Sequence, residues 1–333
     1  MGSKTPKIMR AIEAASFGGP EVLRLAERPV PRPKKAEVLI RVKAAGVNRP
    51  DLLQRKGLYP PPPGASDILG LEVAGTIEKL GPGVRGYAKG QKVTALVTGG
   101  GYAEFCLAPL ETLLGVPGKL TFAEAASLPE AFFTVWSTLF DLGKLQRGET
   151  VLIHGGASGI GVAAIQIASA FGAKVIATAG TDEKVRLCRR LGAKVALNYN
   201  KKDFVAEAKA ATRGKGVDLV LDMVGGDYIQ RNLAALAVGG RLVFLSFLKG
   251  ASAGVNFAPV LAKRLTITGA TLRPRPLAYK GWLRNELLQK VWPLVYKGKI
   301  RPVVDSTFPL AAASDAHRRM EGGAHKGKIV LTL

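Results

Sequence analysis

One short apolar run that passes directly into a glycine-rich turn constrains the fold of this chain more than any other feature. Residues 151–161 read Val-Leu-Ile-His-Gly-Gly-Ala-Ser-Gly-Ile-Gly, and an apolar helical stretch follows. At a turn between a buried strand and a helix, glycines allow a tight bend and let the backbone approach a pyrophosphate. The free N–H groups and dipole of the helix then hold the phosphates. The spacing differs from the usual G-x-G-x-x-G, so the surrounding sequence decides the interpretation.

The surrounding sequence alternates apolar strands with helical stretches. The predicted strands are 151–154, 174–178, 195–199, 218–223, 241–247 and 265–270, and the predicted helices are 160–171, 182–191, 202–212 and 228–237. Such alternation is typical of a parallel sheet with helices on both faces. It predicts an α/β domain with a doubly wound sheet that binds a dinucleotide. The residues expected around the phosphates are Gly156, Ala157, Ser158, Gly159, Ile160 and Gly161.

The flanking regions follow a different pattern. Residues 10–120 contain short alternating or apolar segments separated by Gly and Pro clusters, which favours an irregular β domain. Residues 60–64 include four successive prolines and are expected to form a loop. A helix over 283–296, disturbed at Pro293, and a strand over 328–333 are expected to return to this β domain. We therefore predict a domain at 126–270 inserted between segments 1–125 and 271–333 of a smaller substrate domain.

Composition limits the metal sites and partners. Cys106 and Cys188 lie far apart without His or Cys at metal spacing, so we expect two buried thiols and no zinc site. The formal charge of +23 is carried by scattered Lys and Arg pairs, which indicates a basic, solvated surface that attracts phosphorylated cofactors or, weakly, nucleic acid. Neither a membrane-spanning stretch nor a secretory signal is visible, so a cytoplasmic enzyme is expected.

The second predicted strand bears on the choice of cofactor. An NAD site usually places an acid there to hold the ribose 2′-OH, whereas this chain has Thr178-Ala-Gly180-Thr181. Lys184, one turn later, suits a 2′-phosphate, so NADPH is favoured over NADH. Gly180, Thr181 and Lys184 are the expected contacts. His154 is expected to be a packed residue at the end of its strand.

Several blocks of sequence resemble one family along nearly the whole chain. They are Ala-Ala-Gly-Val-Asn-Arg-Pro-Asp at 44–51, Gly-Leu-Tyr-Pro at 57–60, Leu-Gly-Leu-Glu-Val-Ala-Gly at 69–75 and Gly-Lys-Ile-Val at 327–330. With the glycine turn, they resemble the zinc-independent quinone oxidoreductases of the medium-chain dehydrogenase/reductase superfamily. Residues 48–51 and 60–64 look most like its tumour-suppressor-inducible branch. The resemblance implies a Rossmann-type domain inserted in a GroES-like, mostly β domain.

The resemblance also implies residue roles. Zinc-dependent relatives carry Cys where this chain has Asn48, and Gly-His-Glu where it has Gly70, Leu71 and Glu72, so no metal is expected. Asn48, Tyr59 and Thr134 would border the nicotinamide and substrate. By the same likeness, Tyr199 would lie near the adenosine, and Ser246 and Phe247 near the nicotinamide ribose. The strand from Leu265 to Ala270 would pair across a homodimer.

These observations favour an NADPH-dependent reductase that passes hydride from the nicotinamide to a quinone without a metal. One alternative is an NADPH-dependent enoyl-thioester reductase, in which Tyr59 would stabilise an enolate or donate a proton. An alternative of another class is a redox-linked RNA-binding protein, suggested by the +23 charge. The chain lacks the aromatic-basic interleaving that stacks single strands, which speaks against tight RNA binding.

Overall fold

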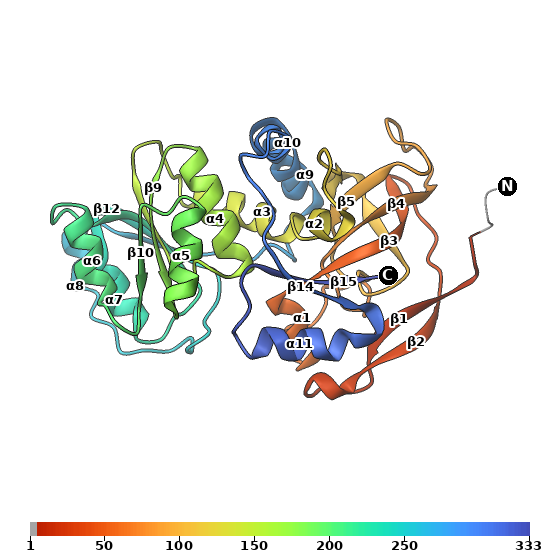
Figure 1. The fold of residues 1–333 in the computed structure, drawn as a ribbon, viewed down its shortest axis with the longest axis horizontal. Helices are drawn as coiled ribbons and strands as arrows, with labels where there is room; N and C mark the ends of the chain where they lie inside the picture. Colours follow the sequence, from red (N-terminus) through yellow and green to blue (C-terminus); the bar gives the residue numbers. More distant parts are fainter. Residues whose placement is uncertain (1–4) are drawn as a thin grey trace. The chain divides into compact units, whose positions relative to one another are not determined.

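The computed structural model describes residues 5–333, which form two compact units (Figure 1). The first unit consists of the chain up to Glu130 together with Arg273–Leu333, and the second unit is Ala131–Leu272. The domain boundaries predicted from the sequence lie after residues 125 and 270, and the two units divide after Glu130 and Leu272. Across the described chain, every helix falls short of the length and apolar character that a membrane span requires.

The first unit is built on a seven-stranded sheet. Its path runs β14-β15-β3-β4-β5-β7, with β6 paired to β3, and β1 and β2 form a separate hairpin. The strands are β1 (Ile8–Ala14), β2 (Leu23–Pro29), β3 (Glu37–Val47), β4 (Glu72–Leu80), β5 (Lys92–Leu96), β6 (Phe105–Pro109), β7 (Leu113–Gly115), β14 (Val304–Pro309) and β15 (Lys328–Thr332). Because β15 pairs antiparallel with β3, the predicted return of the last strand to the first domain is confirmed.

The first unit also contains short helices. They are α1 (Arg49–Arg55), α2 (Phe122–Ala126), α9 (Leu277–Glu286), α10 (Trp292–Tyr296) and α11 (Ala313–Glu321). Of these, α2 and α11 pack against the sheet. Figure 1 shows α11 alongside β14 and β15, which it contacts. The buried core includes Ile40, Val73, Val93, Phe105 and Ile329. Residues 60–64 form a loop, as predicted.

The second unit is a six-stranded parallel sheet with the order β10-β9-β8-β11-β12-β13. The strands are β8 (Thr150–Ile153), β9 (Lys174–Ala179), β10 (Val195–Asn198), β11 (Val217–Asp222), β12 (Leu236–Phe244) and β13 (Thr266–Gly269). The helices are α4 (Gly159–Ala170), α5 (Asp182–Arg190), α6 (Phe204–Ala211), α7 (Tyr228–Ala235) and α8 (Ala258–Lys263). The chain winds from β8 outward to β10 and then from β11 to β13. The predicted doubly wound sheet is confirmed, and its switch point lies between β8 and β11.

Several predicted element boundaries were wrong, among them the strand expected at 241–247, which is β12 (Leu236–Phe244) and ends before Ser246 and Phe247. The helix expected at 283 begins at Leu277, directly after Pro276, and its first turns include Lys280, which is buried with its ammonium donating to the Arg273 carbonyl at 2.8 Å. Near Pro293 the helix widens to π geometry over Leu287–Val291, which accommodates a ring that cannot donate a helical hydrogen bond. The helix expected to reach residue 237 ends at Ala235, because β12 starts at Leu236 and bulges before residue 241.

Candidate active site

The glycine turn between β8 and α4 has the geometry of an anion site. Ser158 is the N-cap of α4, and its Oγ accepts the Gly161 N–H at 3.0 Å. A Cβ at Gly161 would collide with the Gly155 carbonyl, and one at Gly156 would lie 2.8 Å from Cys188 Sγ. These glycines therefore allow α4 to begin directly against the strands, with the backbone N–H groups of Gly159 and Ile160 beyond the carboxyl end of β8.

His154 belongs to a buried polar chain beneath the turn. Its Nε2 lies 2.8 Å from Asn232 Oδ1 and its Nδ1 lies 3.1 Å from Thr178 Oγ1. Asn232 Nδ2 donates to Asp222 at 3.0 Å, which leaves Oδ1 as the acceptor and puts the imidazole proton on Nε2. Burial lowers the pKa of His154 to about 4. The imidazole is thus neutral, and the prediction of a packed strand-end residue is confirmed.

The residues expected to select the cofactor gather where β9 and β10 end. Thr181 caps α5 by accepting the Lys184 N–H at 3.2 Å. Tyr199 is 42% exposed, and a Cβ at Gly180 would lie 2.5 Å from its hydroxyl oxygen. Asn200 Nδ2 donates to the Gly180 carbonyl at 2.9 Å. The predicted Gly180, Thr181, Lys184 and Tyr199 thus lie around one edge of the sheet.

Both carboxylate oxygens of Asp182 accept hydrogen bonds from neighbouring side chains. Asn198 Nδ2 donates to one oxygen at 2.8 Å, and Lys201 Nζ lies 2.6 Å from the other. These two hydrogen bonds lower the pKa of Asp182. Lys201 is a residue that sequence reasoning missed, although it directly follows the third strand in Asn-Tyr-Asn-Lys-Lys. Lys184 and Lys201 therefore place two cations beside the end of β9.

The other predicted cofactor contacts lie at two further places in the second unit. Ser246 and Phe247 follow β12, and the Phe247 ring lies 5.2 Å from that of Phe244. Thr134, on α3 (Pro129–Val135), is buried, and its Oγ1 has no hydrogen-bond partner among residues 5–333. Because buried hydroxyls normally find a partner, the Thr134 hydroxyl fits a role in binding a ligand.

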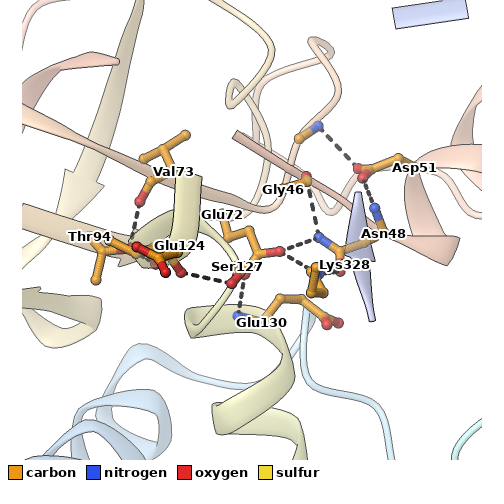
Figure 2. A network of polar contacts seen from close by, with 12 residues as sticks. Gly46, Asn48, Asp51, Glu72, Val73, Thr94, Glu124, Ser127, Glu130 and Lys328 are labelled. Carbon is orange, nitrogen blue, oxygen red and sulfur yellow. Dashed lines mark hydrogen bonds and ion pairs between the residues drawn. The ribbon is translucent and has the colours of Figure 1, made fainter. Parts of the chain in front are cut away.

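A buried ion pair lies at the centre of a polar cluster in the first unit (Figure 2). Lys328 Nζ lies 2.5 Å from Glu72 Oε1 and also donates to Asn48 Oδ1. Asn48 Nδ2 donates to the same Glu72 oxygen at 2.9 Å and to the Gly46 carbonyl at 3.4 Å. The Lys328 and Glu72 side chains are only 5% and 0% exposed. The amide of Asn48 is therefore fixed at both ends, and both of its side-chain N–H groups are used within the chain.

Asp51 anchors the backbone on either side of this cluster. Its carboxylate accepts the N–H groups of Asn48 at 2.8 Å and Gly70 at 3.1 Å, and the Tyr102 hydroxyl at 3.2 Å. Burial raises the pKa of Asp51 to about 6, although the two backbone donors and Lys328 oppose the shift. With three donors on its two oxygens, the Asp51 carboxylate holds together the backbone at Asn48, the backbone at Gly70 and the Tyr102 side chain.

A one-way chain of hydrogen bonds leads to Asp51 from the far side. Arg55 Nη1 lies 3.1 Å from His317 Nδ1, and His317 Nε2 lies 3.1 Å from the Tyr102 hydroxyl. A guanidinium can only donate, so Nδ1 accepts and the imidazole proton sits on Nε2. Tyr102 then accepts from His317 and donates to Asp51. His317 lies on α11, so this helix of the C-terminal segment holds the start of α1 in place by way of Tyr102 and Asp51.

Tyr59 lies beside a buried arginine. The Arg273 guanidinium carbon is 5.6 Å from the centroid of the Tyr59 ring. Arg273 Nε and Nη2 donate to the Thr98 carbonyl at 2.9 and 2.7 Å, but Nη1 is buried without a hydrogen-bond partner in the part of the chain that the structure describes. Burial raises the pKa of Tyr59, and Arg273 opposes the shift. Arg273 is a second residue that the sequence did not reveal.

Glu130 and Lys328 were also missed as site residues. The Glu130 N–H donates to Glu72 Oε2 at 2.9 Å, so Glu72 joins β4, α3 and β15. Asn48 is separated from Glu72 by 24 residues and from Lys328 by 280 residues, and no local pattern reveals such contacts. Within residues 5–333, no three His, Cys, Asp or Glu side chains are grouped to hold a metal ion.

Comparisons with known proteins match both units. Residues 34–137 match the alcohol dehydrogenase GroES-like domain, and residues 159–285 match the family described as zinc-binding dehydrogenase. The quinone oxidoreductase of Rattus norvegicus is 36% identical over 333 residues, with 98% of each chain covered. A phenolphthiocerol/phthiocerol polyketide synthase of Mycobacterium tuberculosis is 35% identical over 307 residues. That match covers 91% of this chain and 14% of the synthase polypeptide.

Solved structures agree with these matches. Escherichia coli quinone oxidoreductase complexed with NADPH has a TM-score of 0.85 at 32% identity, covering 98% of this chain and 100% of that one. An NAD-dependent alcohol dehydrogenase has a TM-score of 0.85 at 36% identity with the same coverage. Likeness of this length and identity shows an oxidoreductase, and the chain belongs to the quinone oxidoreductases of the medium-chain dehydrogenase/reductase superfamily.

Proposed function

We propose that this protein is an NADPH-dependent quinone reductase that works without a metal. A quinone as the hydride acceptor is supported by the full-length likeness to quinone oxidoreductases. The proposal that the enzyme works without a metal is supported by one observation: Glu72 and Asn48 already share the ammonium of Lys328. A metal would have to displace this internal cation and would still need a third or fourth protein donor. Residues 48–51 and 60–64 further support placement near the tumour-suppressor-inducible branch.

The chain's own residues fit NADPH. The backbone N–H groups of Gly159 and Ile160 at the start of α4 would hold the pyrophosphate, with Gly156 and Gly161 keeping the approach open. Lys184 and Lys201 supply positive charge for a 2′-phosphate, whereas Asp182 is already held by Asn198 and Lys201. Tyr199 would cover the adenosine, and Ser246 and Phe247 would flank the nicotinamide ribose.

Bound NADPH supplies the hydride that reduces the acceptor. In the second unit, the Thr134 hydroxyl would bind the cofactor. In the first unit, the Arg273 N–H that has no partner among residues 5–333, beside Tyr59, would bind an acceptor oxygen. The two ends of the Asn48 amide are fixed, so this residue would act as a rigid wall of the site. Holding the reactants in place removes several kcal/mol of barrier.

A specific match favours a second candidate. The polyketide synthase is 35% identical to this chain over the matched region, and an enoyl-thioester acceptor would place Tyr59 and Arg273 beside a developing enolate oxygen. The deciding experiment compares initial rates of NADPH oxidation with a small ortho-quinone and with a short enoyl-CoA. A dominant quinone rate supports the proposal, and a dominant enoyl-CoA rate transfers the assignment to thioester reduction.

We also infer a homodimer. β13 lies at the edge of the parallel sheet, so the strand from Leu265 to Ala270 leaves one side of its backbone available for pairing. Sedimentation equilibrium tests this directly, because the dimer has twice the chain mass of 35.1 kDa. A mass equal to that of one chain across the working concentration range would contradict the inference.

A further inference from the structure

Three carboxylates surround Lys328, and their hydrogen bonding differs. Glu72 contacts Lys328, Asn48 and the Glu130 N–H, and Asp51 holds three donors. The carboxylate of Glu130 receives no hydrogen bond from any residue of the described chain, and the residue is half-buried. Figure 2 shows it running beneath Lys328 in that view, with only its backbone nitrogen tied to Glu72. Of the three acids, Glu130 is therefore the one available to a ligand.

The surroundings of Glu130 suit a proton donor. Burial raises the pKa of Glu130 to about 7, Lys328 opposes the rise, and the negative charges of Glu72 and Asp51 add to it. Tyr59 also lies within electrostatic range. A carboxyl with such a pKa is partly protonated at neutral pH, which is the condition for efficient transfer of a proton there.

The helix that carries Glu130 also carries Thr134. Both belong to α3, and residues four apart on a helix lie on the same face, about one turn from each other. The Thr134 hydroxyl is buried and unpartnered, as described above. An acceptor that is reduced next to Thr134 would thus be within about one helical turn of the free carboxyl.

We propose that Glu130 is the general acid of this reductase and donates a proton to the anionic oxygen of the reduced quinone. The proposal rests on the quinone reductase function argued above. The hydride brings two electrons and one hydrogen to the quinone. The Glu130 O–H bond then breaks as an O–H bond forms on the acceptor, which completes the hydroquinone. Water returns a proton to the carboxylate, so the balance is quinone, NADPH and one solvent proton giving hydroquinone and NADP⁺.

The first test is the pH dependence of kcat with an ortho-quinone for the wild type, Glu130→Gln and a control, Glu286→Gln. Glu286 lies on α9 in an exposed pair with Lys290. The wild type and the control are expected to lose kcat as the pH rises through about 7, because the acid ionises. Glu130→Gln is expected to be slower by roughly 100-fold at pH 6 and to approach the wild-type rate above pH 9. An active variant with the wild-type rate and pH profile overturns the proposal.

Two further measurements separate chemistry from folding. Infrared difference spectra of wild type against Glu130→Gln, without cofactor, are expected to show a protonated carboxyl that titrates near pH 7. A carboxyl already ionised at pH 5 overturns the proposal. Formate is expected to restore part of kcat to Glu130→Ala at acid pH, and absence of rescue in a folded variant counts against a proton-transfer role. A wild type that does not reduce quinones instead overturns the proposed function and, with it, this step.

Discussion

The ammonium of Lys328 lies 2.5 Å from a carboxylate oxygen of Glu72, and both side chains are almost completely buried. Removing one member of a buried pair leaves the other charge without compensation and costs about 3 to 5 kcal/mol. We therefore expect Lys328→Met to lower the free energy of unfolding by about that amount in urea titrations. Lys328→Met combined with Glu72→Gln is expected to recover part of the loss. A loss under about 1 kcal/mol in the single variant would contradict the importance given to the pair.

The fixed tautomer of His317 predicts a pH effect on stability. Burial and the neighbouring Arg55 lower the pKa of His317 to about 3. The unfolded chain, with an ordinary histidine pKa of about 6.5, then binds more protons than the folded chain between pH 6.5 and 3. This contribution to stability is present above pH 6.5 and is lost as the pH falls. The difference in unfolding free energy between wild type and His317→Gln is expected to shrink by about 1.4 kcal/mol per pH unit below pH 6. A difference independent of pH would refute a neutral His317.

Lys184 and Lys201 are expected to select the phosphorylated cofactor. A charge-assisted hydrogen bond contributes about 1.5 to 3 kcal/mol, so Lys184→Ala is expected to raise the KM for NADPH by about tenfold or more. The KM for NADH is expected to stay within about twofold, because NADH lacks the 2′-phosphate. Lys201→Ala is expected to act in the same direction, and Lys209→Ala on α6 is the control. An unchanged preference for NADPH in both lysine variants would exclude the assigned role.

Gly161 is expected to tolerate no side chain. A Cβ there would meet the backbone of Gly155 and Gly156, which cannot move without displacing the turn. Gly161→Ala is expected to weaken NADPH binding, measured by fluorescence titration, by at least about tenfold. Gly254→Ala, where no atom lies within 4 Å of the added carbon, is the matched control. Equal affinities of the two variants would show that the turn does not hold the phosphates.

The second unit was largely predictable from sequence because its signals are local. The glycine turn, the capping residue Ser158 and the strand periodicity all act within a few residues of one another. The boundary at β12 was misjudged because Leu236 is buried in a strand that then bulges, which local propensity does not reveal. The arrangement around Lys328 could not be predicted, because it depends on which strands become neighbours. Glu130 carries no motif, and its importance arises only when β4 and β15 bring Glu72 and Lys328 to it.

The position of β15 inside the first sheet, between β14 and β3, also sets the order in which the protein can be completed during synthesis. β15 lies between β14 and β3, so the first sheet remains split until residues 328–332 have left the ribosome. The second unit is one continuous segment, Ala131–Leu272, and can fold while the rest is being made. The roughly 200 residues between Glu130 and Lys328 take about 10 to 40 s to translate. For that time the edge of β3 that pairs with β15 lacks its neighbour, and Glu72 lacks its buried cation.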